Sequence, residues 1–217
     1  MAINLENYNS IRAELGDKAL LVAVSKTKPV DDIKALYDQG QRDFGENYVQ
    51  ELVDKQPQLP ADIRWHYIGH LQSNKVKYIA PFVHLIHGVD SYKLLKEINK
   101  QAQKQNRVIN CLLQVHIAQE ETKFGLDETE LDALLVELNN GPLQNITING
   151  LMGMASFSDD MNIVRVEFKV LKKLFDKLKR KLPQANILSM GMSSDYKIAV
   201  EEGSTLVRIG SLLFGSR

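Results

Sequence analysis

The fold of this chain is most constrained by a repeated alternation of short apolar runs with longer amphipathic stretches. Eight runs read as strands, at 19–25, 42–44, 65–68, 83–89, 108–117, 147–152, 186–189 and 205–209. Between them, apolar residues recur at helical spacing, at 31–39, 47–55, from 73, from about 91, at 127–139, 161–181 and 195–202. This alternation predicts parallel strands joined by right-handed crossovers.

The number of units separates two architectures. Eight strand–helix units close into a barrel with the helices outside, whereas a doubly wound open sheet would carry Gly-x-Gly-x-x-Gly after the first strand. Ser25-Lys26-Thr27-Lys28 stands there instead, and no linker divides the sequence. We expect an α/β fold, a single-domain (β/α)8 TIM-type barrel over residues 1–217 with an extra N-terminal helix near 4–15.

Charge balance, hydropathy and the single cysteine argue against several classes of function. Lys+Arg and Asp+Glu are balanced at 27 each, so a nucleic-acid partner is not expected. No window reaches the ~18 apolar residues of a membrane span, and the first residues lack a signal-peptide layout. We therefore expect a cytoplasmic protein without a membrane partner. Cys111, the single cysteine, lies in a strand-like run and reads as a core thiol.

The first strand ends in a lysine-rich turn. The apolar run of residues 20–24 is followed by Ser25-Lys26-Thr27-Lys28-Pro29. In parallel barrels the carboxyl ends of the strands carry the ligand site, so Lys26 is a candidate binding group. The alternative is that both lysines are the solvated start of a loop.

The loops after the seventh and eighth strands are rich in glycine and hydroxyl groups. In barrels these two loops commonly form a phosphate site, although each by itself is also typical of a plain turn. A phosphate site facing a lysine is the layout of an aldehyde cofactor bound as a Schiff base, pyridoxal 5′-phosphate (PLP). The candidate phosphate-side residues are Ser189, Gly191, Met192, Ser193, Gly210 and Ser211.

Five ordered motifs resemble the pyridoxal phosphate homeostasis protein family. They span the whole chain and lie at Ala23–Pro29, Phe44–Glu51, Trp65–Lys75, Leu188–Ser193 and Val207–Gly210. The resemblance implies a barrel like the N-terminal domain of alanine racemase, PLP fold type III, with Lys26 bound to the cofactor. It also implies a role in vitamin B6 homeostasis without established turnover. His70 departs from the family pattern, in which many members carry proline.

Roles for individual side chains follow from their chemistry. Lys26 must lose a proton before it attacks an aldehyde, and partial burial beside Lys28 favours that loss. Arg208, leaving the eighth strand, is the candidate partner of the pyridine nitrogen. A guanidinium donates hydrogen bonds but accepts none, so it keeps that nitrogen unprotonated and the ring a weak electron sink.

Two of the remaining candidates, Asn47 and Lys123, each have two possible interpretations. Asn47 is the candidate for the phenolate oxygen, or the N-cap of the following helix. Lys123, past the fifth strand, receives cofactor during transfer or is an exposed loop lysine. Lys28 and His66 are secondary candidates for the cofactor site. No metal site is expected, because histidines three apart on a strand face opposite sides.

Three functions from different classes remain at this stage. The first is a monomeric PLP carrier without turnover that supplies apo PLP-dependent enzymes. The second is a PLP-dependent amino-acid racemase, but racemases of this fold use a tyrosine from a second domain, and this sequence ends at Arg217, shortly after its eighth strand. The third is a barrel that binds another phosphorylated metabolite without a covalent bond. We expect the first.

Overall fold

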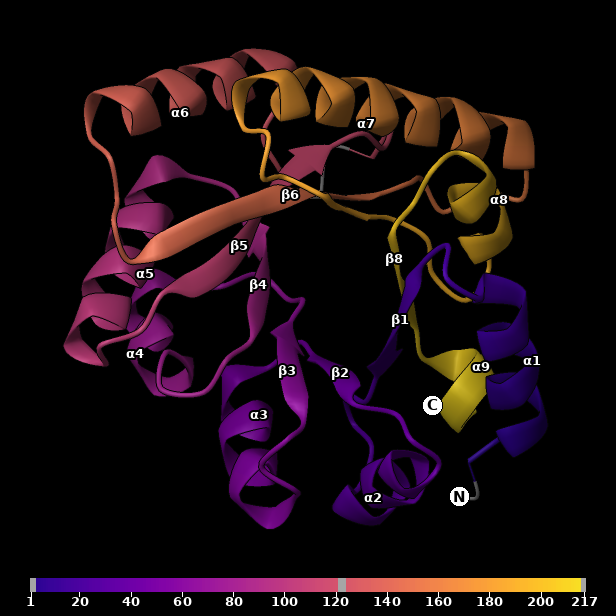
Figure 1. The fold of residues 1–217 in the computed structure, drawn as a ribbon. Coiled ribbons are helices and arrows are strands. Elements are labelled where there is room, and N and C mark those ends of the chain that lie inside the picture. The colour runs from indigo at the N-terminus through magenta and orange to yellow at the C-terminus, as the bar shows by residue number, and fades with distance from the viewer. Residues whose placement is uncertain (1–2, 121–123, 216–217) are drawn as a thin grey trace.

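The strands of the computed structural model, which describes residues 3–120 and 124–215, form a closed parallel barrel. Each strand pairs with the next, and β8 pairs with β1 through four consecutive residue pairs. The helices lie outside the strands (Figure 1). The expected (β/α)8 barrel is therefore confirmed. The strands are β1 (Leu20–Val24), β2 (Asp43–Glu46), β3 (Arg64–Tyr67), β4 (Leu85–Val89), β5 (Ile109–His116), β6 (Ile146–Met154), β7 (Ile187–Ser189) and β8 (Leu206–Ile209).

Helices connect successive strands and flank the barrel at both ends of the chain. They are α1 (Leu5–Leu15), α2 (Val30–Asp38), α3 (Val49–Lys55), α4 (Val76–Ile79), α5 (Tyr92–Lys104), α6 (Glu128–Asn140), α7 (Met161–Lys181), α8 (Tyr196–Glu201) and α9 (Ser211–Phe214), with 3₁₀ turns at Gln56–Gln58 and Ser73–Lys75. Among the described residues, no helix is long and apolar enough to span a bilayer.

Two local features differ from the sequence prediction. The helix expected from residue 73 begins later, at Val76, because Ser73 is the first residue of a 3₁₀ turn that leads into the short α4. The helix α9 was not expected, because four residues are too few to show helical periodicity. The backbone N–H of Asn4 donates to the carbonyl of Leu213, so α1 and α9 lie side by side near the two termini (Figure 1).

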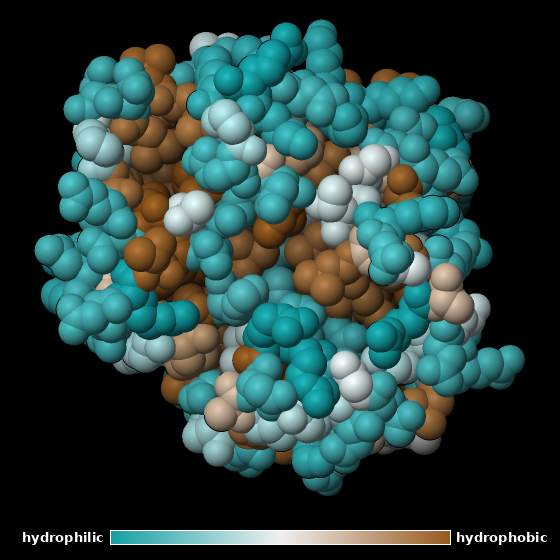
Figure 2. Space-filling view, viewed as in Figure 1, coloured by the Kyte–Doolittle hydropathy of each residue, from teal (hydrophilic) through white to brown (hydrophobic). Residues whose placement is uncertain are grey.

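The strands present different residues to the inside and outside of the barrel. Outward-facing side chains join the helices in one large apolar core, which includes the α7 stripe of Phe168, Leu171 and Phe175. A smaller apolar cluster from five strands fills part of the interior, namely Val22, Leu85, Leu112, Met152 and Leu206. Buried polar side chains also face the interior, among them those of His66, His87 and Ser189. In the view of Figure 2, hydrophilic side chains cover most of the visible face, with hydrophobic ones showing between them.

Replacing Phe168 by alanine tests how much of the stability comes from helix packing on the barrel. The side chain is fully buried in α7, so Phe168→Ala should lower the free energy of unfolding by about 3–5 kcal/mol. Val166→Ala is the control, since Val166 lies on the same helix and is 60% exposed; its effect should stay within about 0.5 kcal/mol. Urea unfolding measures both, and equal effects would contradict this packing.

Candidate functional site

A pocket of about 410 Å³ opens at the carboxyl ends of the strands. It lies among the loops that follow β1, β2, β6, β7 and β8, which is the edge where the sequence predicts the ligand site. Of the predicted cofactor residues, those that line it are Lys26, Asn47, Met192, Ser193, Arg208, Gly210 and Ser211, together with the secondary candidate Lys28.

Three other candidates do not line this pocket, and a fourth lies outside the described residues. Ser189 is fully buried behind Arg208, and His66 lies inside the barrel. Gly191 has a φ of +97° and is packed so closely on Ala199 that a Cβ there would lie 2.6 Å from the Ala199 methyl group. Lys123 lies outside the described residues. The roles of these four in cofactor binding stay predictions.

An apolar wall of the pocket escaped the sequence analysis. It is formed by Val24, Ile68 and Met154. Each follows an inward-facing residue of its own strand by two positions, namely Val22, His66 and Met152. Strand alternation continued past the strand ends is the signal that predicts these three residues.

The backbone turn that carries Lys26 is held by buried ion pairs. Lys55 Nζ donates to the carbonyl of Ser25 at 2.8 Å, to Glu46 Oε1 at 2.8 Å and to Glu51 Oε1 at 2.6 Å. Glu51 Oε1 also accepts the N–H of Thr27 at 2.5 Å. We call Ser25, Glu46, Glu51 and Lys55 the β1 clamp, because it fixes the residues on both sides of Lys26.

The clamp stabilises an uncommon backbone conformation. Thr27 has a φ of +63°, which is costly for a β-branched residue and persists only where the surroundings enforce it. Inside the clamp, the hydroxyl of Ser25 donates to Glu46 at 2.6 Å. Burial raises the pKa of Glu46, while Lys55 and Ser25 oppose the rise. In the sequence, Glu51 and Lys55 look like an ordinary solvated helix pair.

The two predicted phosphate loops lie together. Ser193, after β7, accepts a hydrogen bond through Oγ from the N–H of Gly210, after β8, at 3.3 Å. Asp195 holds the first loop by accepting the N–H of Met192 at 2.5 Å. Ser211 begins α9, in which the N–H groups of Leu213 and Phe214 donate to the carbonyl of Gly210, so only those of Ser211 and Leu212 precede the first hydrogen bonds of the helix. The loops therefore present hydroxyls and backbone donors to the pocket.

Arg208 extends from β8 into the pocket floor. Its Nη1 donates to the carbonyl and the hydroxyl of Ser189 at 2.9 and 2.5 Å, and its Nη2 donates to the carbonyl of Gly153 at 3.1 Å. Burial lowers the pKa of Arg208 to about 10, with Asp195 opposing the shift, so the guanidinium is charged at neutral pH. The bonds to Ser189 and Gly153 use three of the five N–H groups of arginine.

Asn47 lines the pocket and does not cap a helix. The helix α3 begins at Val49 with Tyr48 at its N-cap, so the alternative reading of Asn47 as N-cap is wrong. Its Oδ1 is buried and has no hydrogen-bond partner within residues 3–120 and 124–215. A buried polar atom without a partner is costly, and a ligand in the pocket would supply one.

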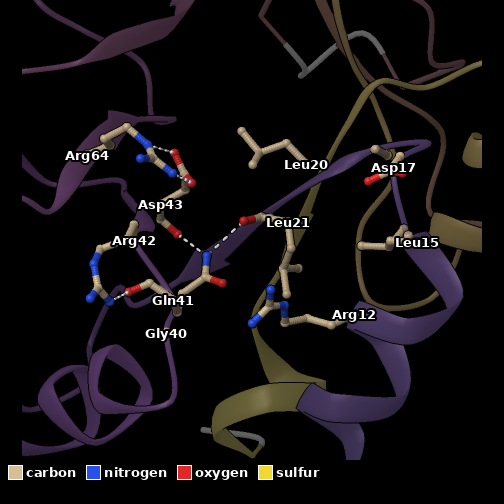
Figure 3. A pocket seen from close by; sticks show the side chains of 12 residues that line it. Arg12, Leu15, Asp17, Leu20, Leu21, Gly40, Gln41, Arg42, Asp43 and Arg64 are labelled. Carbon is tan, nitrogen blue, oxygen red and sulfur yellow. Dashed lines mark hydrogen bonds and ion pairs between the residues drawn. The ribbon is translucent and has the colours of Figure 1, made fainter.

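A second pocket, of about 360 Å³, lies at the opposite end of the barrel (Figure 3). Arg42 and Arg64 line it, but each is paired with a carboxylate, Asp62 and Asp43 respectively. Gln41 closes its inner wall by donating to the carbonyls of Leu21 and Asp43. Arg12 also lines this pocket, next to the Tyr8 ring. Because the described residues that line it include no lysine, this pocket has no amine that could bond to an aldehyde.

Comparison with known proteins shows the family of this chain. The family described as "Alanine racemase, N-terminal domain" matches residues 4–217. The pyridoxal phosphate homeostasis protein of Pasteurella multocida is 41% identical over 204 residues, which cover 91% of this chain and 86% of that protein. The chain belongs to the pyridoxal phosphate homeostasis protein family.

Solved structures agree with this membership. PipY of Synechococcus elongatus PCC7942, solved with PLP bound, superposes with a TM-score of 0.89 at 37% identity, covering 97% of this chain and 99% of PipY. Alanine racemase from Bartonella henselae superposes with a TM-score of 0.70 at 19% identity, covering 97% of this chain and 59% of the racemase. The racemase likeness shows the shared barrel fold.

Breaking the β1 clamp at Lys55 should lower the stability of the protein. Lys55→Met leaves the buried Glu46 carboxylate without its cation, so we expect a loss of about 3–5 kcal/mol in the free energy of unfolding. The control Lys34→Met breaks an exposed pair with Asp38 and should cost less than about 1 kcal/mol. Denaturant titration measures both, and Lys55→Met combined with Glu46→Gln should recover part of the loss. A Lys55→Met protein as stable as the control would exclude the clamp.

Proposed function

We propose that this protein binds PLP through a covalent bond to Lys26 and holds it for vitamin B6 homeostasis without turning over a substrate. The observation that carries the proposal is one pocket lined by Lys26, Arg208 and both glycine–serine loops. The names of the relatives and the PLP-bound PipY structure support the cofactor.

The residues of the pocket fit this cofactor in charge and size. The volume of about 410 Å³ lies in the range of small-ligand sites. Lys26, Lys28 and Arg208 bring three cationic side chains, which suit a ligand with a phosphate and a phenolate. In this proposal Ser193, Gly210 and Ser211 bind the phosphate, Met192 lines the same end of the pocket, and Asn47 binds the phenolate oxygen.

The residues around the ring favour holding over catalysis. PLP supplies an aldehyde that bonds to amines and a ring that withdraws electrons when its nitrogen is protonated. Arg208 only donates hydrogen bonds, so it cannot accept one from a protonated pyridine nitrogen as a carboxylate can, and the nitrogen stays unprotonated. The apolar wall of Val24, Ile68 and Met154 carries no group able to move a proton.

Further parts of the proposal concern the setting of the protein. We propose that residues 1–217 act as one PLP-binding barrel domain, as a monomer in the cytoplasm. Phe157 lines the pocket and its side chain is 95% exposed. We propose that this exposed rim contacts apo PLP-dependent enzymes when the cofactor is delivered. Lys123 would act in that transfer, as the sequence analysis suggests.

The covalent bond is tested by trapping it. Borohydride treatment of the PLP-loaded protein should fix the cofactor on Lys26, as read from the mass of the modified peptide. Lys26→Ala should leave no fixed cofactor, and Lys28→Ala, which keeps the proposed attachment site, should still be labelled. Labelling of Lys28 or Lys123 in the unmodified protein would refute the assignment.

The absence of turnover is tested by proton exchange. The PLP-loaded protein is incubated with L- and D-alanine in heavy water, and loss of the Cα proton signal is followed by NMR. A weak electron sink and no positioned base should keep exchange far below enzymatic rates. Exchange at about 1 per second or faster, as enzymes achieve, would favour the racemase hypothesis instead.

A further inference from the structure

A continuous network of five buried polar side chains crosses the barrel interior. His66 Nε2 lies 3.0 Å from Asp43 Oδ1, and His66 Nδ1 lies 2.9 Å from His87 Nε2. His87 Nδ1 lies 3.1 Å from Ser189 Oγ, which accepts from Arg208 at 2.5 Å. None of the five is more than 4% exposed. We call Asp43, His66, His87, Ser189 and Arg208 the axial network.

The axial network connects the two ends of the barrel. Asp43 is the first residue of β2 and lines the pocket of Figure 3, where Arg64 binds it through two nitrogens. Arg208 lies at the other end and lines the proposed PLP pocket. Alternate residues of β2, β3, β4, β7 and β8 face inward and supply the members between these ends.

The chemistry of the two ends fixes the direction of the two terminal hydrogen bonds of the network. Arg208 can only donate, so Ser189 Oγ accepts from it and is free to donate its own proton to His87 Nδ1. Asp43 as a carboxylate can only accept, so His66 Nε2 donates to it. In the order that we infer, Ser189 donates to His87 Nδ1, and His66 accepts at Nδ1 from His87 Nε2. This order satisfies both ends, with all donors pointing toward Asp43.

The charges of the members agree with this direction. Burial would raise the pKa of Asp43, but the hydrogen bonds from Arg64 and His66 outweigh it and lower the pKa to about 2. Burial, with His66 and Arg208 nearby, holds the pKa of His87 well below its usual range. Near neutral pH, Asp43 is therefore an anion and His87 is neutral, as the order of bonds requires.

We propose that Asp43, His66 and His87 are positioning residues that orient Arg208 toward the pyridine nitrogen of PLP. The contact between Arg208 and the cofactor rests on the proposed function; the network itself does not. With its proton engaged by His87, Ser189 Oγ turns only lone pairs toward the guanidinium. The rotation of the guanidinium is thereby fixed, and the remaining N–H groups of Arg208 stay available to the pocket.

The first test needs no cofactor. In protein labelled with ¹⁵N at histidine and without added PLP, NMR at neutral pH should show His66 and His87 both neutral with the proton on Nε2. Either ring with its proton on Nδ1 alone, or either ring as a cation, would overturn the proposal. This readout is independent of the proposed function.

The second test asks whether a change at Asp43 affects PLP binding at the other end of the barrel. Asp43→Leu removes the acceptor at the end remote from the PLP pocket, so it should change the ¹⁵N signals of His87 and raise the Kd for PLP about tenfold, the effect of one hydrogen bond to a charged group. Arg64→Met is the control, because it removes the ion pair with Asp43 but keeps the His66–Asp43 bond; its Kd should stay within about twofold of the unmodified protein.

A smaller change covers the case that Asp43→Leu fails to fold. Ser189→Ala breaks the network beside Arg208 and should also raise the Kd about tenfold and change the absorption spectrum of bound PLP. Ser204→Ala is matched to it, because that buried hydroxyl donates only to backbone carbonyls. A Ser189→Ala protein with unchanged Kd and spectrum would overturn the proposal. Failure of the unmodified protein to bind PLP would instead refute the proposed function.

Discussion

The burial of the Arg208 guanidinium inside the barrel is the constraint on which the site depends. A buried cation needs acceptors for its N–H groups, and here they come from Ser189 and from the carbonyl of Gly153. Those acceptors lie on β7 and β6, so the site requires the closed barrel to bring the strands to the correct register. The polar interior follows from this, because Ser189 in turn needs His87.

The wall of the pocket that carries Lys26 is also held by polar groups, in this case those of the β1 clamp. Lys26 follows a strand that ends in a strained turn at Thr27, and the β1 clamp holds that turn through Lys55 and its two carboxylates. The β1 clamp behind Lys26 and the axial network behind Arg208 hold two sides of the pocket in place. Preorganisation of this kind places side chains for a ligand before the ligand arrives.

Much of the fold could be predicted because it depends on local patterns. The run at 20–24 and the stripe of Phe168, Leu171 and Phe175 are each interpretable without knowledge of their partners. The pocket was predictable to a similar degree, since the carboxyl ends of parallel strands meet at one edge. Lys26, Ser193 and Gly210 accordingly lie together. The short α9 and the 3₁₀ turn at Ser73 were not predictable, because each has too few residues to show a period.

The sequence by itself therefore determined the barrel, the rim that carries the ligand site and the residue types that suit PLP. Only the tertiary structure decided what lies behind those residues. Asp43, His66 and His87 are far apart in the sequence, and hydrogen bonds between them exist only because strand alternation and barrel closure direct their side chains to one axis. Likewise, Lys55 looks like a solvated helix lysine until the fold buries it against Glu46. Hydrophobic periodicity is a local signal, whereas the pairing of buried polar groups depends on register and closure.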